Sequence, residues 1–250
     1  MTAGQETVVR SPAKLNLVLA VGSPMADGYH PLVSVMDAVD FCDTLHIRIS
    51  DADAPMVVVD APGLPGGDTL ITRAVSLLLA EIHADVRVDI ALDKHIPVGA
   101  GLGGGSSNAA TAMGAVNALL GERCSGAQLA AIAAQVGSDI PFFFAPQHGA
   151  VVEGRGEQVT ALEPDTIPSR TWLILWPGTG CATADVYRRY QSRRAMLPPV
   201  NDVVEDARSG QFRNDLAEPA LASNTQMRTL YDRCVARFGA DAVLVAGSGS

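Results

Sequence analysis

The chain has 250 residues, of which 48% are hydrophobic and 18% charged, a balance typical of a globular protein with one large domain or two small ones. Its 27 acidic residues outnumber 18 lysines and arginines, and the net charge of −9 disfavours a protein that coats nucleic acid. No apolar stretch approaches the ~20 residues of a membrane-spanning helix. The N-terminus lacks a signal-peptide pattern, and the four cysteines are scattered without metal-ligand spacing. We therefore expect a cytoplasmic protein with reduced thiols.

The first half of the chain combines predicted strands and helices. Alternating apolar residues predict strands over residues 7–19, 32–49 and 86–92. Helical patterns end at Gly121 and Gly137, and predict helices over residues 69–82, 106–120 and 126–136. We expect Ser11-Pro12 to break the first strand, and Asp68 to cap the helix that follows a Pro/Gly-rich loop over residues 62–67.

The second half is predicted in less detail. Residues 140–162 are expected to form strands with a tight turn over residues 153–156. Residues 172–176 indicate a buried strand, residues 185–239 are mostly helical, and residues 241–246 indicate a strand that enters Gly-Ser-Gly-Ser.

The most informative stretch is the glycine-rich segment before the second helix. Five of the seven residues from Gly99 to Gly105 lack a Cβ, so the backbone can adopt positive φ and approach a ligand closely. The loop enters a helix N-terminus, where free N–H groups favour an anion such as phosphate. The P-loop signature is absent, because no Lys-Ser or Lys-Thr ends the loop.

Four motifs in one order resemble the GHMP kinase family. They are SPAKLNL at residues 11–17, ADGYH at 26–30, GGGSSNAA at 103–110 and GSDIP at 137–141. The resemblance implies an α+β fold of two domains. One is an N-terminal ribosomal-protein-like domain over residues 1–165. The other is a ferredoxin-like domain over residues 166–250, which we expect to be incomplete relative to the family.

The resemblance also implies a reaction. Such a kinase uses ATP to phosphorylate the 2-hydroxyl of 4-diphosphocytidyl-2-C-methyl-D-erythritol, an intermediate of the non-mevalonate isoprenoid pathway. We expect Mg²⁺ to be carried with ATP rather than held by a set of protein ligands. The implied partners are these small molecules, without nucleic acid or membrane, and the protein is expected to be a monomer or a weak homodimer.

Lys14 and Asp139 are the catalytic pair that the resemblance implies. A carboxylate can orient the accepting hydroxyl and take its proton, and a lysine can stabilise charge on the transferred phosphoryl group. From pattern alone, Asp139 also fits a turn cap before Pro141, and Lys14 also fits a solvated strand residue.

The resemblance assigns ATP binding to one lysine and to the whole loop. The residues are Lys94, Pro97, Val98, Gly99, Ala100, Gly101, Leu102, Gly103, Gly104, Gly105, Ser106, Ser107 and Asn108. From the sequence alone Lys94 also fits a solvated lysine, and the two serines also fit a helix cap. The family often carries Asn-Leu where this chain has Thr69-Leu70.

Substrate binding is assigned to Asn16, Tyr29, His30, Thr183 and Tyr187. We expect the two tyrosines to sandwich the cytosine, with His30 at its polar edge. Tyr187 fits core packing equally well, and Asn16 fits a strand residue that faces solvent.

Three other functions stay open at this point. One is another GHMP kinase, acting on homoserine or mevalonate. Another is a dinucleotide-dependent oxidoreductase, because Gly99, Gly101 and Gly104 fit G-x-G-x-x-G and Glu122 follows about 20 residues later. The third is a non-catalytic RNA-binding module.

Overall fold

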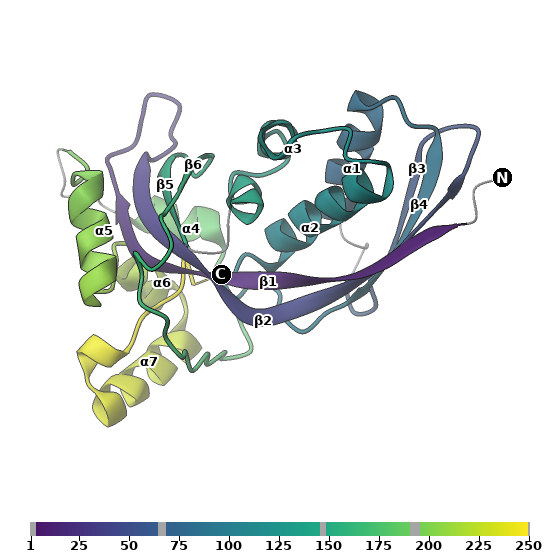
Figure 1. Ribbon diagram of the computed structural model, residues 1–250. Coiled ribbons are helices and arrows are strands. Elements are labelled where there is room, and N and C mark those ends of the chain that lie inside the picture. Colours follow the sequence, from purple (N-terminus) through teal and green to yellow (C-terminus); the bar gives the residue numbers. More distant parts are fainter. Residues whose placement is uncertain (1–3, 65–68, 146–148, 191–195, 250) are drawn as a thin grey trace. The chain divides into compact units, whose positions relative to one another are not determined.

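The computed structural model describes residues 4–64, 69–145, 149–190 and 196–249. The chain divides into two compact units (Figure 1). The first unit comprises residues 1–13, 39–96 and 103–144, and the second comprises residues 14–38, 97–102 and 145–250. Two long strands, β1 (Gln5–Val21) and β2 (Leu32–Asp51), contribute residues to both units. The predicted domains, residues 1–165 and 166–250, are consecutive stretches of chain, unlike these two units. That domain division stays a prediction.

The first unit has a sheet with one apolar face. The C-terminal part of β2 pairs antiparallel with β4 (Val86–Asp93), which pairs in parallel with β3 (Met56–Asp60). Leu45, Ile47 and Ile49 are buried as their alternation predicts. β3 was not predicted from the sequence, and its five residues alternate between exposed and partly buried. It also placed a break at Ser11-Pro12, but β1 continues through both residues.

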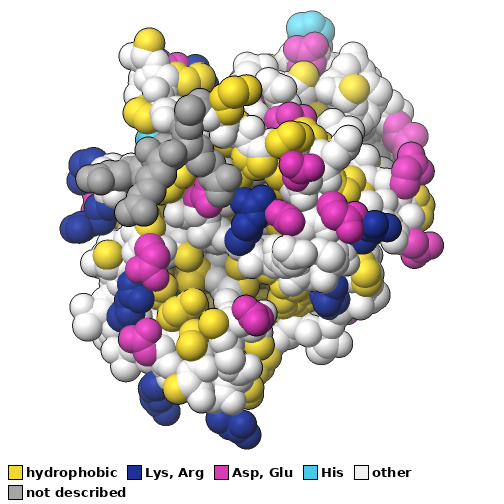
Figure 2. Space-filling model, turned by 90° about the vertical axis from the view of Figure 1, so that its left-hand side faces the viewer, with side chains coloured by type: hydrophobic (Ala, Val, Ile, Leu, Met, Phe, Trp, Pro, Cys, Tyr) yellow, Lys and Arg dark blue, Asp and Glu magenta, His cyan; other side chains and the backbone are white. Residues whose placement is uncertain are grey.

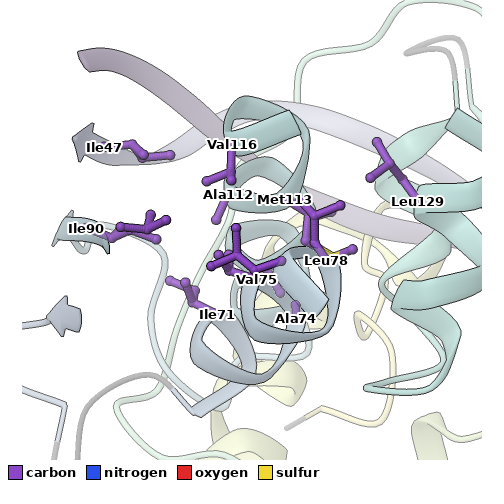
Figure 3. Close-up of a cluster of buried hydrophobic side chains, with 14 of the residues drawn as sticks. Ile47, Ile71, Ala74, Val75, Leu78, Ile90, Ala112, Met113, Val116 and Leu129 are labelled. Carbon is purple, nitrogen blue, oxygen red and sulfur yellow. The ribbon is translucent and has the colours of Figure 1, made fainter. Parts of the chain in front are cut away.

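Helices cover the apolar face of this sheet. They are α1 (Thr69–Glu81), α2 (Gly104–Leu119) and α3 (Gly126–Ala134), close to the predicted ranges, followed by the 3₁₀ turn η1 (Pro141–Phe144). Figure 3 shows Ile47 and Ile90 of the sheet facing the helices, with Val75 of α1 and Met113 of α2 in the same cluster. Each such side chain, when fully buried, contributes about 1.5–3 kcal/mol of transfer free energy.

The second unit contains a hairpin, β5 (Ala150–Gly154) and β6 (Gln158–Ala161), whose tight turn was predicted. β5 pairs with the start of β2, and β7 (Arg213–Asn214) pairs in parallel with β1 at Val18 and Leu19. The remaining elements are mostly helical, as predicted: α4 (Thr183–Arg189), α5 (Val200–Ser209), α6 (Ala217–Ser223), α7 (Thr225–Phe238) and η2 (Ala240–Ala242).

Three predicted strand segments are wrong. The first, over residues 172–176, forms no strand. The second, over residues 241–246, begins in η2 and continues without strand structure. The third, over residues 141–144, forms η1. A strand needs a neighbour to pair its backbone N–H and C=O groups, and an apolar run in the sequence does not provide one. The predicted cap Asp68 and part of the loop over residues 62–67 lie outside the described residues.

The unpaired segments 172–176 and 243–246 border an apolar groove of about 760 Å³ in the second unit. Phe212 and Tyr231 also line it, and the ring centroids of Trp172 and Phe212 lie 5.2 Å apart. Figure 2 shows hydrophobic side chains in several places on the visible face, with one patch in its lower half. All four cysteines are free thiols. The helices within the described ranges are too short or too polar to cross a membrane.

Candidate active site

The glycine loop adopts the conformation for which glycine is needed. Gly99, Gly101 and Gly103 have φ values of 70°, 71° and 69°, so alternate residues are left-handed. The first i→i−4 bond of α2 runs from Ser107 N to Gly103 O at 2.9 Å. The N–H groups of the residues between them therefore precede the helical ladder, which creates a site suited to an anion.

The start of α2 also explains why glycine continues past the loop. A Cβ on Gly104 would lie 3.0 Å from both Lys94 Nζ and Ile96 Cγ2, and one on Gly105 would lie 3.2 Å from Leu70. The helix begins two residues earlier than predicted, with Gly103 as its cap and no side-chain cap bond. The capping role considered for Ser106 and Ser107 is therefore wrong.

Two polar side chains near the start of α2 are fully buried. Ser107 is fully buried and accepts a hydrogen bond from Ser11 Oγ at 2.7 Å. Asn108, also fully buried, donates through Nδ2 to Asp43 Oδ2 at 3.0 Å. Lys94 donates to the same carboxylate oxygen at 2.6 Å, and only 14% of its side chain is exposed. Lys94 is thus held in a buried ion pair and is not a solvated lysine.

The second unit surrounds Lys14 with polar partners. Lys14 is 4% exposed, its Nζ donates to Asn16 Oδ1 at 2.6 Å, and its backbone N–H donates to Leu102 O at 2.9 Å. Asn16 Nδ2 donates to Ser34 Oγ at 2.9 Å, and Ser34 Oγ donates to Val18 O at 2.7 Å. The solvated alternatives for Lys14 and Asn16 are therefore wrong. Ser34, which fixes the rotamer of Asn16, was not predicted from the sequence.

The glycine segment near residue 247 lies beside the same lysine. Gly247 has φ +53°, and a Cβ there would lie 3.5 Å from Lys14 Nζ and 3.1 Å from Gly101 O. Asn214 Nδ2 donates to Val245 O at 2.7 Å and to Gly247 O at 2.6 Å, which holds this segment in place. Asn214 was not singled out from the sequence, because its partners lie more than thirty residues further along the chain.

Thr183 and Ser248 meet on the same side of the second unit. Their hydroxyl oxygens are 3.0 Å apart, so one donates to the other. Thr183 is exposed and begins α4, and Ser248 follows Gly247. The predicted substrate residue Thr183 is therefore tied to the glycine segment.

Of the aromatic residues in the predicted cytosine site, His30 and Tyr187 lie close together. The His30 ring centroid lies 5.5 Å from that of Tyr187 and 5.8 Å from that of Tyr190. Nδ1 of His30 lies 2.8 Å from Gly22 O. A carbonyl oxygen accepts, so Nδ1 carries a proton and Nε2 of a neutral ring is left as an acceptor.

Tyr29 has a different neighbour. Its side chain is 59% exposed, and the Arg155 guanidinium carbon lies 4.6 Å from its ring centroid. Arg155 also forms an ion pair with Asp27, whose other carboxylate oxygen accepts from Tyr29 N at 3.1 Å. One ring face of Tyr29 is thus covered by a cation, and the sandwich with Tyr187 stays a prediction.

Asp139 is half-buried in the turn between α3 and η1. It belongs to the first unit and Lys14 to the second, so their catalytic pairing stays a prediction. Within the described ranges, no three acidic, histidine or cysteine side chains cluster as metal ligands. Glu122, which the oxidoreductase alternative would need at a strand end, instead follows α2 with φ +54°.

Comparisons with known proteins give the family. A model described as the N-terminal domain of GHMP kinases matches residues 69–146. The 4-diphosphocytidyl-2-C-methyl-D-erythritol kinase of Anaeromyxobacter sp. (strain Fw109-5) is 38% identical over 96% of this chain and 78% of its own length. The corresponding kinase of Xanthomonas axonopodis pv. citri (strain 306) is 35% identical over 96% of this chain and 79% of its own length.

Solved structures agree with the sequence relatives. A crystal structure of a 4-(cytidine 5'-diphospho)-2C-methyl-D-erythritol kinase has a TM-score of 0.78 at 31% identity, over 98% of this chain and 88% of that one. Mevalonate kinase of Methanococcus jannaschii has a TM-score of 0.60 at 13% identity, over 98% and 88% of the two chains, which is a likeness of fold alone. The chain therefore belongs to the GHMP kinase family, within the group of 4-diphosphocytidyl-2-C-methyl-D-erythritol kinases.

Proposed function

We propose that this protein transfers the γ-phosphoryl group of ATP to the 2-hydroxyl of 4-diphosphocytidyl-2-C-methyl-D-erythritol in the non-mevalonate isoprenoid pathway. The observation that carries the proposal is the buried Lys14, whose backbone N–H donates to Leu102 of the glycine loop and beside which Gly247 lies. A buried ammonium next to phosphate-binding backbone stabilises the charge that moves during phosphoryl transfer. The relatives at 35–38% identity support this acceptor over homoserine or mevalonate.

In this mechanism the protein mainly positions the two substrates and neutralises the negative charge of the phosphates. The N–H groups at the start of α2 bind phosphate oxygens, and Lys14, oriented by Asn16, faces the transferring group. Asp139 orients the tertiary hydroxyl and accepts its proton as the new P–O bond forms, while the bond from the γ-phosphorus to the bridging oxygen breaks and ADP leaves. Ser106 lies in the first turn of α2, and its hydroxyl would help to hold Mg²⁺ carried with ATP, which would neutralise phosphate charge.

Cytosine recognition follows from the tautomer of His30. Its Nε2 acceptor is complementary to the exocyclic amino group of cytosine, whereas uracil presents a carbonyl oxygen at the same place. Tyr29 and Tyr187 supply ring faces for stacking, which contributes about 1–3 kcal/mol per base. The expected cytoplasmic location and monomeric or weakly dimeric state belong to the same proposal.

The direct test is ADP release by the purified chain in the presence of ATP, Mg²⁺ and the diphosphocytidyl substrate. Homoserine, mevalonate and the diphosphouridyl analogue serve as comparison acceptors. We expect turnover with the cytidine substrate at least a hundredfold above each comparison. Equal turnover with the uridine analogue would contradict the role of His30, and turnover only with mevalonate or homoserine would contradict the proposed acceptor.

A further inference from the structure

A fully buried carboxylate that the reaction does not use lies in the first unit. Asp43 is 0% exposed and accepts four hydrogen bonds. Its Oδ1 accepts from the backbone N–H groups of His95 and Ile96, each at 2.7 Å. Its Oδ2 accepts from Lys94 Nζ at 2.6 Å and from Asn108 Nδ2 at 3.0 Å.

These four donors come from the two segments that flank the glycine loop. Residues 94–96 directly precede the loop over residues 97–103, and Asn108 lies in the first turns of α2, directly after it. One carboxylate on β2 therefore ties down both ends of the loop. Gly104 completes the contact, because its missing Cβ allows α2 to lie against Lys94 and Ile96.

The loop depends on such anchors. Its three left-handed glycines allow many backbone conformations, and a loop that binds phosphate through N–H groups must hold them in one arrangement. Anchoring both ends lowers the conformational entropy that is lost when a ligand binds. We propose that Asp43 is a positioning residue that pre-organises the glycine loop for the phosphates of ATP, acting through Lys94, residues 95–96 and Asn108.

A purely structural role would not explain the pattern of donors. Lys94 alone would need a counter-charge, but half of the bonds to Asp43 come from backbone N–H groups just before the loop. Asn108 adds a bond across to α2 although its own Oδ1 has no partner within the described part of the chain. A charge pair that merely filled the core would not need these loop-flanking bonds.

The test rests on the proposed use of ATP, and it measures nucleotide binding apart from turnover. Calorimetry with a non-hydrolysable ATP analogue is compared for the unaltered protein and Asp43→Asn, below the melting temperature of each. The amide offers one acceptor oxygen in place of two, so it cannot serve both flanks. We expect at least tenfold weaker nucleotide binding and an unchanged KM for the diphosphocytidyl substrate.

Two further variants sharpen the result. Asp43→Asn combined with Asn108→Asp exchanges amide and carboxylate while keeping composition and charge, and should restore nucleotide affinity to within about threefold. If the single variant does not fold, Asn108→Ala is measured in its place, because it removes the bond from α2 to Asp43, and unchanged nucleotide affinity in that variant would contradict the proposal. Asp89→Asn is the matched control in the same unit, because Asp89 pairs with Arg87 at the half-exposed surface. Its nucleotide affinity should be unchanged.

Three outcomes would overturn the inference. One is a dissociation constant of the Asp43→Asn variant for the analogue that lies within twofold of that of the unaltered protein. Another is a folded exchange variant that binds as weakly as the single one. The third is a KM for the diphosphocytidyl substrate that rises as much as the nucleotide dissociation constant. If the unaltered protein itself does not bind the analogue, both this inference and the proposed kinase function fail.

Discussion

Lys14, Asn16 and Ser34 form a chain of buried side chains in which each hydrogen bond fixes the next rotamer. Lys14 and Asn16 are 4% and 2% exposed, and Ser34 is fully buried. A buried ammonium is costly unless its N–H groups are hydrogen-bonded, and the bond to Asn16 satisfies one of them and directs the group. Sequence pattern placed Lys14 and Asn16 on one face of a strand, but it could not find Ser34, which lies on the neighbouring strand.

At the same scale, Asp139→Asn should lower kcat by 10²–10⁴, the range expected for general-base catalysis, with nearly unchanged nucleotide affinity. Steady-state kinetics and calorimetry on one preparation measure both. Asp202→Asn is the control, since Asp202 is exposed on α5. A loss of less than tenfold for Asp139→Asn would remove the proposed base.

Tyr29→Ala should lower kcat/KM for the cytidine substrate by about 10–100-fold, because base stacking contributes about 1–3 kcal/mol. The KM for ATP should stay unchanged, since the tyrosine lies in the turn before β2. Tyr231→Ala, on α7, provides a tyrosine control with no expected kinetic effect. If Tyr29→Ala only lowers the melting temperature, the ring packs on Arg155 without contacting the base.

At the scale of elements, strong periodicity made α1, α2 and β4 predictable within a few residues. Sequence pattern failed where the presence of a neighbouring strand decides whether a segment becomes a strand. Residues 172–176 are apolar throughout, as in a buried strand, yet they form no ladder. The site was predictable where motifs lie in one segment, as in the glycine loop.

Asp43 was missed for a related reason, because its donors lie 51 to 65 residues further along the chain. A signal was nevertheless present. Asp43 has the same parity as Leu45, Ile47 and Ile49, so the alternation puts a carboxylate on the buried face of β2. A charge on such a face predicts a set of buried donors, although the sequence does not say which they are.

The two glycines that flank α2 allow a matched test of the loop. Gly103 and Gly121 have φ values of 69° and 89°, so alanine at either position should cost about 1–2 kcal/mol of stability. Both variants should lower the melting temperature, but only Gly103→Ala should raise the KM for ATP, by about fivefold or more. Equal effects on KM from both variants would show that the loop conformation is not specific to nucleotide binding.

At the scale of the whole molecule, the apolar groove of the second unit should be detectable in solution. Leu173 is 76% exposed and Leu175 47% exposed beside a cavity of about 760 Å³, and exposed apolar surface binds apolar dyes. Leu173→Lys with Leu175→Lys should reduce dye fluorescence by at least half. Val8→Lys, at an exposed valine of the first unit, is the control. Unchanged fluorescence in the double variant would place the dye elsewhere.

The motifs identified the family because they span residues 11 to 141 and come from both compact units, and the first of them crosses from one unit to the other. The order of the units along the chain was not predictable. The chain passes from one unit to the other after residues 13, 38, 96, 102 and 144. Composition and local pattern carry no information about such crossings, since these depend on contacts distant in sequence.

The parallel pairing of β1 with β7 has a consequence for synthesis on the ribosome. Val18 pairs with Arg213, so 195 further residues, the difference between the two positions, must be synthesised before that edge of β1 can pair. At typical elongation rates this takes about 10–40 s. During that time an apolar strand edge in the nascent chain has no native partner and can pair with other chains. The second unit therefore completes its sheet late, and chaperone binding to the nascent chain should concentrate on β1 until residue 214 has emerged.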